Sequence, residues 1–278
     1  MTEKVWFITG CSRGFGRLWA EAALERGDKV VATARDVGSL GGLAAAHPDT
    51  CLAVPVDVTD RASIAAAVES AVLRFGRIDV VVNNAGFAVV GAVEEVDEND
   101  VRDIFETNVF GPLWVLQATL PVLRAQGAGH VVNVTSLAGL IGEPALGLYN
   151  ASKWALEGLS EALALEVEHL GIKVTVVEPG PYATEFGSTS SLRRAGENPA
   201  YDQARSRLYA SFDPTDIGDP TATAAAVFRA VDADDPPKRL TLGKTVFPRA
   251  RDRYGERLAT WDAWAAVSAA AHGSPEGP

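Results

Sequence analysis

The sequence places a tyrosine and a lysine four residues apart, at Tyr149 and Lys153. On a helix, residues i and i+4 lie on one face, so the phenol and the ammonium group would be neighbours. Tyrosine has an ordinary pKa near ~10, and a cation held close to the phenol lowers that pKa. A tyrosine tuned in this way can exchange a proton with a carbonyl or alcohol oxygen. The same spacing also occurs in ordinary, partly buried helices, so the pair alone does not establish this chemistry.

Two kinds of segment alternate along the chain and indicate how this pair would be positioned. Short apolar runs predict strands at residues 5–9, 29–34, 52–56, 78–83, 130–135, 172–177 and 239–242, and longer stretches predict helices at 17–26, 63–75, 101–123 and 149–170. Pro112 predicts a kink or junction within the third of these helices. Apolar strands that alternate with helices are typical of a parallel sheet covered on both faces. We therefore expect an α/β, doubly wound, Rossmann-type sheet of about seven strands, in a single domain over residues 1–278.

Three segments depart from this alternation. Residues 183–218 are rich in Ser, Thr, Arg, Pro and Gly and hold aromatic residues, so we interpret them as loops and short helices inserted over the site. The alternative is a disordered surface excursion. Residues 272–278 are expected to form a flexible tail. Trp261 and Trp264 stand three apart on an expected last helix, and we interpret them as packing residues.

Composition and charge exclude several classes of function. The net charge of −11 is opposite to that of a nucleic-acid-binding protein. No apolar run is long enough for a membrane span, and the first residues lack the pattern of a secretory signal, so we expect a cytoplasmic protein. Cys11 and Cys51 are too few for a disulfide framework, and the four histidines are isolated, so no metal site is expected.

A glycine-rich loop joins the first expected strand to the first expected helix. Its sequence is Thr9-Gly10-Cys11-Ser12-Arg13-Gly14-Phe15-Gly16, with the spacing G-x-x-x-G-x-G. Glycines let the backbone turn tightly and approach a pyrophosphate, whose charge is then stabilised by the helix N-terminus. The position of this loop therefore predicts a dinucleotide site.

The end of the second expected strand predicts which dinucleotide is bound. Arg35 occupies the position that contacts the adenosine ribose, and Arg13 lies in the glycine loop on the same side. Two guanidinium groups can hold one phosphate with forked hydrogen bonds, which favours NADP(H) over NAD(H). Asp36 follows directly and would either pair with Arg35 or turn away.

With these pieces in place, the chain resembles the classical short-chain dehydrogenase/reductase family from residue 5 to about residue 184. Its glycine loop looks like the family's cofactor loop, and Asn108, Ser136, Tyr149 and Lys153 match the family's catalytic tetrad. The resemblance implies cofactor contacts from Gly10, Ser12, Arg13, Gly14, Phe15, Gly16, Arg35, Asp57, Val58, Asn84, Ala85, Gly86, Tyr149, Lys153, Pro179, Gly180, Tyr182 and Thr184. It also implies a homodimer or homotetramer.

The resemblance assigns a role to each member of the tetrad. Tyr149 would be the general acid/base at the substrate oxygen, and Ser136 would hydrogen-bond that oxygen. Lys153 would lower the pKa of Tyr149 and hold the nicotinamide ribose, and Asn108 would position a water that links Lys153 to solvent. The structural alternatives are that Ser136 caps a strand end, that Asn108 satisfies a helix kink, and that Asn84 is only a turn residue.

These roles predict an NADP(H)-dependent carbonyl reductase or alcohol dehydrogenase. We expect Ser136, Leu137, Glu143, Leu146 and Phe186 to line a substrate pocket suited to an apolar ketone, aldehyde or secondary alcohol. One alternative is a non-catalytic, NADP(H)-sensing regulatory protein on the same fold. Another is an epimerase or dehydratase, but such relatives usually carry the spacing G-x-x-G-x-x-G, which this loop lacks.

Overall fold

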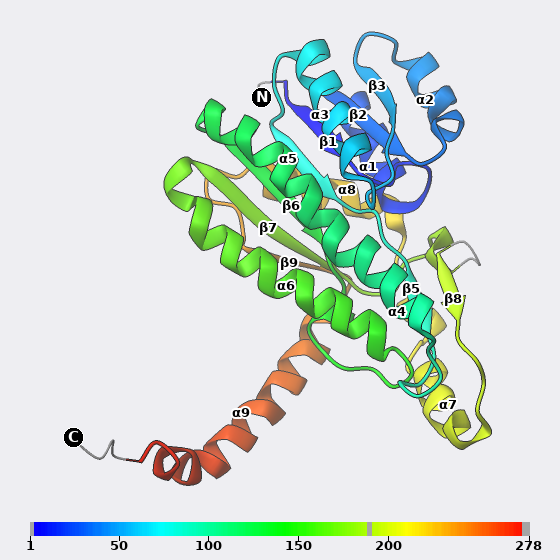
Figure 1. Cartoon of the computed structure of the whole chain (residues 1–278), viewed down its shortest axis with the longest axis vertical. Helices are drawn as coiled ribbons and strands as arrows, with labels where there is room; N and C mark the ends of the chain where they lie inside the picture. Colours follow the sequence, from blue (N-terminus) through cyan, green and yellow to red (C-terminus); the bar gives the residue numbers. More distant parts are fainter. Residues whose placement is uncertain (1–2, 188–190, 274–278) are drawn as a thin grey trace.

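The central sheet of the computed structural model, which describes residues 3–187 and 191–273, has seven parallel strands within those residues (Figure 1). The strands are β1 (Val5–Ile8), β2 (Lys29–Ala34), β3 (Cys51–Pro55), β4 (Val80–Asn83), β6 (Gly129–Val134), β7 (Ile172–Pro179) and β9 (Arg239–Leu242), in the order β3-β2-β1-β4-β6-β7-β9. The expected α/β sheet is confirmed. Strand order reverses between β1 and β4, and ligands of such sheets bind beyond the carboxyl ends of the strands at this point.

Helices cover both faces of the sheet, as expected. On one face lie α1 (Gly14–Glu25), α2 (Gly41–Ala46) and α8 (Thr223–Val231), and on the other lie α3 (Arg61–Phe75), α5 (Gly111–Gln126) and α6 (Gly147–Val167). Successive side chains of a strand point to opposite faces. Accordingly, Trp6 and Ile8 of β1 are buried in the first layer, whereas Phe7 is buried in the second.

The third helical stretch is divided near Pro112, as predicted, but by a wide turn that the sequence did not indicate. The helix α4 (Glu98–Phe105) is followed by a wide π-helical turn, Glu106–Phe110, and only then by α5. Pro112 lies in the first turn of α5, where its missing N–H costs no hydrogen bond. The expected break at Pro112 was therefore displaced: it falls just before the proline, in the turn that carries Asn108.

Part of the predicted insertion is tied to the body by a small second sheet. The strands β5 (Ala88–Val90) and β8 (Leu192–Arg194) pair in parallel, and the helix α7 (Asp202–Ala210) follows β8. Arg193 lies over the ring of Phe87, 4.6 Å from its centroid, and pairs with Asp103 at 2.7 Å. Each strand has three residues, too few to show a pattern in the sequence. Residues 188–190 of the predicted insertion lie outside the described residues.

The last helix, α9 (Val246–Ala270), leaves the body and points away from the sheet (Figure 1). Trp261 and Trp264 are 64% and 63% exposed, so the interpretation of both as packing residues was wrong within this chain. Most of the expected tail, residues 274–278, lies outside the described residues. No helix among the residues that the structure describes has the length and apolar character needed to cross a bilayer.

Candidate active site

A cavity of about 790 Å³ lies beyond the carboxyl ends of the central strands. Every residue predicted for the site lines it, except Gly16 and Asn108, which lie directly behind its wall. The lining residues that were predicted are Gly10, Ser12, Arg13, Gly14, Phe15, Arg35, Asp57, Val58, Asn84, Ala85, Gly86, Ser136, Leu137, Glu143, Leu146, Tyr149, Lys153, Pro179, Gly180, Tyr182, Thr184 and Phe186. One cavity therefore joins the glycine loop to the Tyr149–Lys153 pair.

The glycine loop presents backbone donors to this cavity. Gly10 and Gly14 adopt positive φ angles of 73° and 59°, which glycine tolerates without strain. The helix α1 starts at Gly14 with no side-chain cap, so the N–H groups of its first turn have no partner within the helix. Such an N-terminus attracts anions, because its free N–H groups and the helix dipole both favour negative charge.

Asn84 fastens this loop to the end of β4. Its Nδ2 donates to the carbonyl oxygens of Thr9 at 2.9 Å and Gly10 at 3.1 Å, and Thr9 Oγ1 accepts from the backbone N–H groups of Asn84 and Ala85. A Cβ on Gly16 would lie 2.4 Å from Asn84 Nδ2 and 2.5 Å from Gly10 O. Asn84 therefore holds the glycine loop to the end of β4 by hydrogen bonds and is not only a turn residue. Gly16 has no side chain, and this allows the loop and the start of α1 to pack against Asn84.

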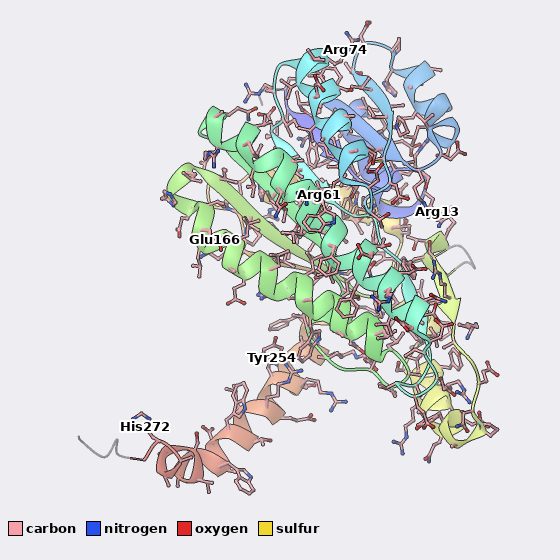
Figure 2. All side chains as sticks on the ribbon, viewed as in Figure 1. Arg13, Arg61, Arg74, Glu166, Tyr254 and His272 are labelled. Carbon is pink, nitrogen blue, oxygen red and sulfur yellow. The ribbon has the colours of Figure 1, made fainter. Side chains whose placement is uncertain are left out.

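The two arginines predicted to read the ribose both border the cavity. Arg35 is exposed just after β2, and Arg13 Nη2 donates to Ser191 Oγ at 2.7 Å. Figure 2 labels Arg13 at the edge of the molecule beside β8. Asp36 turns away, because its Oδ1 accepts from the N–H of Gly38 at 2.9 Å and caps a short 3₁₀ turn. The Asp36 carboxylate is therefore not paired with Arg35, and the guanidinium of Arg35 can contact a ligand.

Tyr149 and Lys153 lie in the first turns of α6, and Ser136 follows β6. Tyr149 is buried, with its ring 5.9 Å from that of Phe186. Burial raises the pKa of Tyr149 to about 12, against a smaller lowering by the hydrogen bond with Ser136. The expectation that Lys153 lowers this pKa was wrong for this arrangement, because burial dominates and the Lys153 Nζ is 5.9 Å from the centre of the phenol ring.

Lys153 is also buried and is directed at the sheet. Its Nζ donates to Val134 O at 2.9 Å. Burial lowers the pKa of Lys153 to about 8, and the negative charge of Glu157 opposes this shift. The charge of Lys153 therefore titrates close to physiological pH, which an exposed lysine does not do.

Asn108 is fully buried in the π-helical turn and supports the cavity wall from behind. Its Oδ1 accepts from Phe87 N at 3.1 Å, and its Nδ2 donates to Phe87 O at 2.8 Å and Ser152 Oγ at 3.1 Å. These bonds join Asn108 to the residue before β5 and to α6, so its amide does more than pair with polar groups of its own helix. A Cβ on Gly86 would meet Asn108 Oδ1 at 3.0 Å, which places this amide just behind the strand end. Single π turns of this kind are frequent at functional sites.

Residues 4–195 match the family model described as short chain dehydrogenase, which is more than half of the chain. The chain belongs to the short-chain dehydrogenase family. It is 41% identical to Oxidoreductase BOA17 of Botryotinia fuckeliana, over 86% of this chain and 89% of that protein. It is 35% identical to the 3-ketodihydrosphingosine reductase of Bacteroides thetaiotaomicron, over 88% of this chain and 90% of that protein.

Solved structures of short-chain dehydrogenases share the fold over nearly the whole chain. A short-chain dehydrogenase from Streptomyces avermitilis is 41% identical, with a TM-score of 0.89 over 97% of this chain and 98% of that one. One from Burkholderia phymatum, in complex with NAD, is 27% identical with a TM-score of 0.80 over 93% and 95%. An alcohol dehydrogenase from Thermococcus sibiricus, complexed with 5-hydroxy-NADP, is 26% identical with a TM-score of 0.74 over 88% and 98%. This protein is therefore an oxidoreductase of a family that binds nicotinamide dinucleotides.

Near the carboxyl edge of the sheet of this short-chain dehydrogenase, a half-exposed arginine pairs with two buried carboxylates, which the sequence did not reveal. Arg239 of β9 pairs with Glu178 of β7 at 2.7 Å and also with Glu157 of α6. Glu157 accepts from Thr135 Oγ1 at 2.5 Å, and Thr135 precedes Ser136. Burial raises the pKa values of both carboxyls, that of Glu178 to about 7, and the nearby charge of Glu157 adds to the shift of Glu178. The cluster joins the ends of β6, β7 and β9 to the helix of Tyr149.

The outer part of the cavity is more apolar than the glycine-loop end. Glu143 lines the cavity and also pairs with Arg249 from the start of α9. No pattern in the sequence points to Arg249, which is 106 residues away from its partner. Further apolar lining comes from β5, from the residue before it and from the segment that was expected to lie over the site, and includes Phe87, Val90, Leu192, Leu208, Phe212 and Ile217.

Proposed function

We propose that this short-chain dehydrogenase uses NADP(H) to interconvert a ketone or aldehyde and the corresponding alcohol, with Tyr149 as general acid/base. The observation that carries the proposal is that Tyr149, Ser136 and Lys153 line the same cavity as the glycine loop. Bound there, a nicotinamide dinucleotide supplies or accepts the hydride, while the protein supplies orientation and the proton.

The residues at the loop end of the cavity fit a dinucleotide. The uncapped start of α1 offers N–H groups to a pyrophosphate. Because Gly10 and Gly16 carry no side chain, the loop can pack closely against Asn84 and Ala85 and keep that helix start in place. Arg35 is exposed at the cavity rim and is not paired with Asp36, so its guanidinium can hold a 2′-phosphate. These contacts support NADP(H) as the dinucleotide.

At the other end, the phenol of Tyr149 holds the proton that carbonyl reduction requires. Because burial raises its pKa to about 12, Tyr149 stays protonated at neutral pH and is ready to donate. Ser136 can hydrogen-bond the same substrate oxygen and stabilise the charge that develops on it. The positive charge of Lys153 can hold the nicotinamide ribose and so position the dinucleotide beside the phenol.

Replacing Arg35 by aspartate tests the choice of dinucleotide. The new carboxylate would repel a 2′-phosphate and accept from a free 2′-hydroxyl, so we expect the ratio of kcat/KM for NADPH over NADH to fall at least tenfold. Steady-state kinetics with both cofactors measure this ratio. Arg229→Asp, an exposed arginine on α8 outside the cavity lining, is the matched control and should leave the ratio unchanged. An unaltered ratio in Arg35→Asp would contradict the NADP(H) assignment.

The titration of Lys153 predicts that the catalytic rate with NADPH falls at alkaline pH. Its pKa of about 8 means that Lys153 is charged below pH 8 and becomes neutral above it. Because the charged form holds the ribose, kcat/KM for NADPH should be flat below about pH 8 and fall above it, by about tenfold per unit. In Lys153→Arg, which stays charged, this limb should disappear even where the rate is lower. A wild-type profile that stays flat to pH 10 would count against the role of Lys153.

The apolar outer cavity supports a bulky apolar substrate. The chemistry fits the name of the Bacteroides relative, which gives a ketone, 3-ketodihydrosphingosine, as its substrate. NADPH oxidation should be measured with a panel of ketones and aldehydes of increasing chain length, and NADP⁺ reduction with secondary alcohols. Turnover that rises with apolar size supports the proposal. Tight NADPH binding with no turnover on any member would favour the regulatory alternative instead.

A further inference from the structure

The first turn of α9 forms part of the cavity wall beside Ser136. A buried apolar cluster joins that turn to the segment after Ser136, and consists of Leu137, Leu140, Ile141, Val246 and Ala250. On the other side of the turn, a Cβ on Gly180 would lie 2.9 Å from Val246 Cγ2. Arg249 comes just before Ala250 and lines the cavity. The fold therefore fixes an arginine in the wall of the proposed substrate space.

Glu143, the partner of Arg249, lies on a segment whose backbone is firmly held. The N–H of Glu143 donates to Asn150 Oδ1 at 3.2 Å, and Asn150 directly follows Tyr149 on α6. Ala145 has a φ of 55°, and in the described part of the chain no other residue except glycine has a positive φ. Such a conformation persists only where the surroundings impose it, and it is most frequent at functional sites. The Glu143 backbone is therefore anchored next to the helix turn of Tyr149.

The Glu143–Arg249 pair has unused hydrogen-bonding capacity. The side chain of Arg249 is 36% exposed and that of Glu143 is 14% exposed. Among the residues that the structure describes, the hydrogen bond between these two side chains uses only Arg249 Nη2 and Glu143 Oε1. A guanidinium group has five N–H donors, and a carboxylate has two acceptor oxygens. The pair can therefore both donate to and accept from a group placed in the cavity.

We propose that the Glu143–Arg249 pair selects a carbonyl substrate whose apolar chain carries an uncharged hydroxyl group away from the reacting carbonyl. The inference rests on the proposed carbonyl reduction and adds a polar feature to its substrate. A hydroxyl oxygen accepts from Arg249 while its proton is donated to Glu143, so one group meets both partners. The pair sets specificity, and Tyr149 still supplies the proton.

The charges around the outer cavity favour an uncharged group. Outside the predicted dinucleotide contacts, the charged side chains that line the cavity are Asp103, Glu106, Glu143, Asp213, Asp216, Arg193 and Arg249. Acids outnumber arginines, and Arg193 is already paired with Asp103. A substrate carboxylate or phosphate would meet this excess of negative charge. A substrate ammonium would be repelled by Arg249 and could not accept a hydrogen bond from it. A hydroxyl group avoids both costs.

The test compares two double variants of the full-length protein with matched pairs of ketones. Glu143→Leu with Arg249→Leu removes both charges together, so neither partner is left unpaired. Arg253→Leu with Glu256→Leu removes a second arginine–glutamate pair, which joins at 2.9 Å further along α9 and lies outside the cavity lining. The ketones are methyl ketones of increasing chain length, each with and without a hydroxyl group at the far end.

We expect the wild type to have a kcat/KM about tenfold or more higher for the best hydroxyketone than for its partner without the hydroxyl, because a hydrogen bond to a charged group discriminates by at least this factor. This ratio should fall to about one in the Glu143/Arg249 variant and stay unchanged in the Arg253/Glu256 variant. An ion pair with a purely structural role would affect both ketones alike and keep the ratio. NADPH binding and thermal unfolding show that each variant is folded.

Several outcomes would overturn the inference and leave carbonyl reduction standing. They are a ratio near one in the wild type, an unchanged ratio in the Glu143/Arg249 variant, and a wild type that prefers the matching keto acid or amino ketone. If no ketone is turned over, the proposed function fails. Calorimetric titration of the same ketone pairs into the enzyme with NADP⁺ then decides the inference: the hydroxyl should lower Kd about tenfold in the wild type only, and equal Kd values overturn it.

Discussion

Tyr149→Phe is expected to lower kcat for carbonyl reduction by about 10²–10⁴-fold, the usual worth of general acid catalysis, while NADPH still binds. The ring of Tyr149 is buried against Phe186, and phenylalanine preserves that contact. Only the hydroxyl is lost, and with it the proton for the substrate oxygen. Stopped-flow or steady-state oxidation of NADPH measures the rate, and quenching of tryptophan fluorescence measures binding.

Tyr201→Phe is the matched control for this variant. Its hydroxyl donates to Glu94 outside the cavity, so it removes a bonded phenol without touching the proposed chemistry. It should keep the wild-type rate. If Tyr149→Phe also kept a near-normal rate, the assignment of the acid/base would fail, although membership of the family would stand.

Gly16→Ala is the second change with a large expected effect. The new Cβ would lie 2.4 Å from Asn84 Nδ2 and 2.5 Å from Gly10 O, and a backbone oxygen cannot swing aside as a side-chain tip can. Overpacking of this kind costs about 1–3 kcal/mol of unfolding free energy. Because the loop must move off β4, we expect the Kd for NADPH to rise at least tenfold, as measured by fluorescence titration alongside thermal unfolding.

Gly42→Ala provides the comparison for that experiment. Gly42 is in α2, and a Cβ there would meet nothing within 4 Å. Alanine in an open helical position should raise stability by about 0.5–1 kcal/mol and leave the Kd for NADPH unchanged. If Gly16→Ala behaved like Gly42→Ala, the close approach of loop and β4 would not be required for binding.

The strands that hold the site could be predicted because each is a local pattern. The runs at β1 and β2 agree with the structure to within one residue at either end, since burial on both faces leaves few polar positions in them, and the edge strand β9 agrees although Arg239 is exposed. The ends of helices were harder. The helix α1 begins three residues before the predicted start, because the glycine loop turns directly into it. The wide turn at Asn108 depends on bonds to Phe87, which no local pattern contains.

The unpredicted parts of the site depend on contacts between distant residues. Arg249 reaches Glu143 across the cavity, and Arg239 reaches Glu157 across the sheet, so their partners follow only from the folded chain. The pKa of Tyr149 went in the opposite direction to the prediction for a related reason. Spacing places Lys153 on the same helical face, but it does not indicate how deeply the phenol is buried, and burial decides the sign.

The charge cluster around Arg239 couples the titration of Lys153 to that of two buried carboxyls. Glu157 lies between Arg239 and Lys153, and its negative charge favours the protonated form of Lys153. Glu157, Glu178 and Lys153 therefore titrate as one coupled system beside Arg239, which stays charged throughout. Since Arg239 lies on the edge strand β9, a substitution at the rim of the sheet would alter the acid–base chemistry at Lys153 without contacting the substrate.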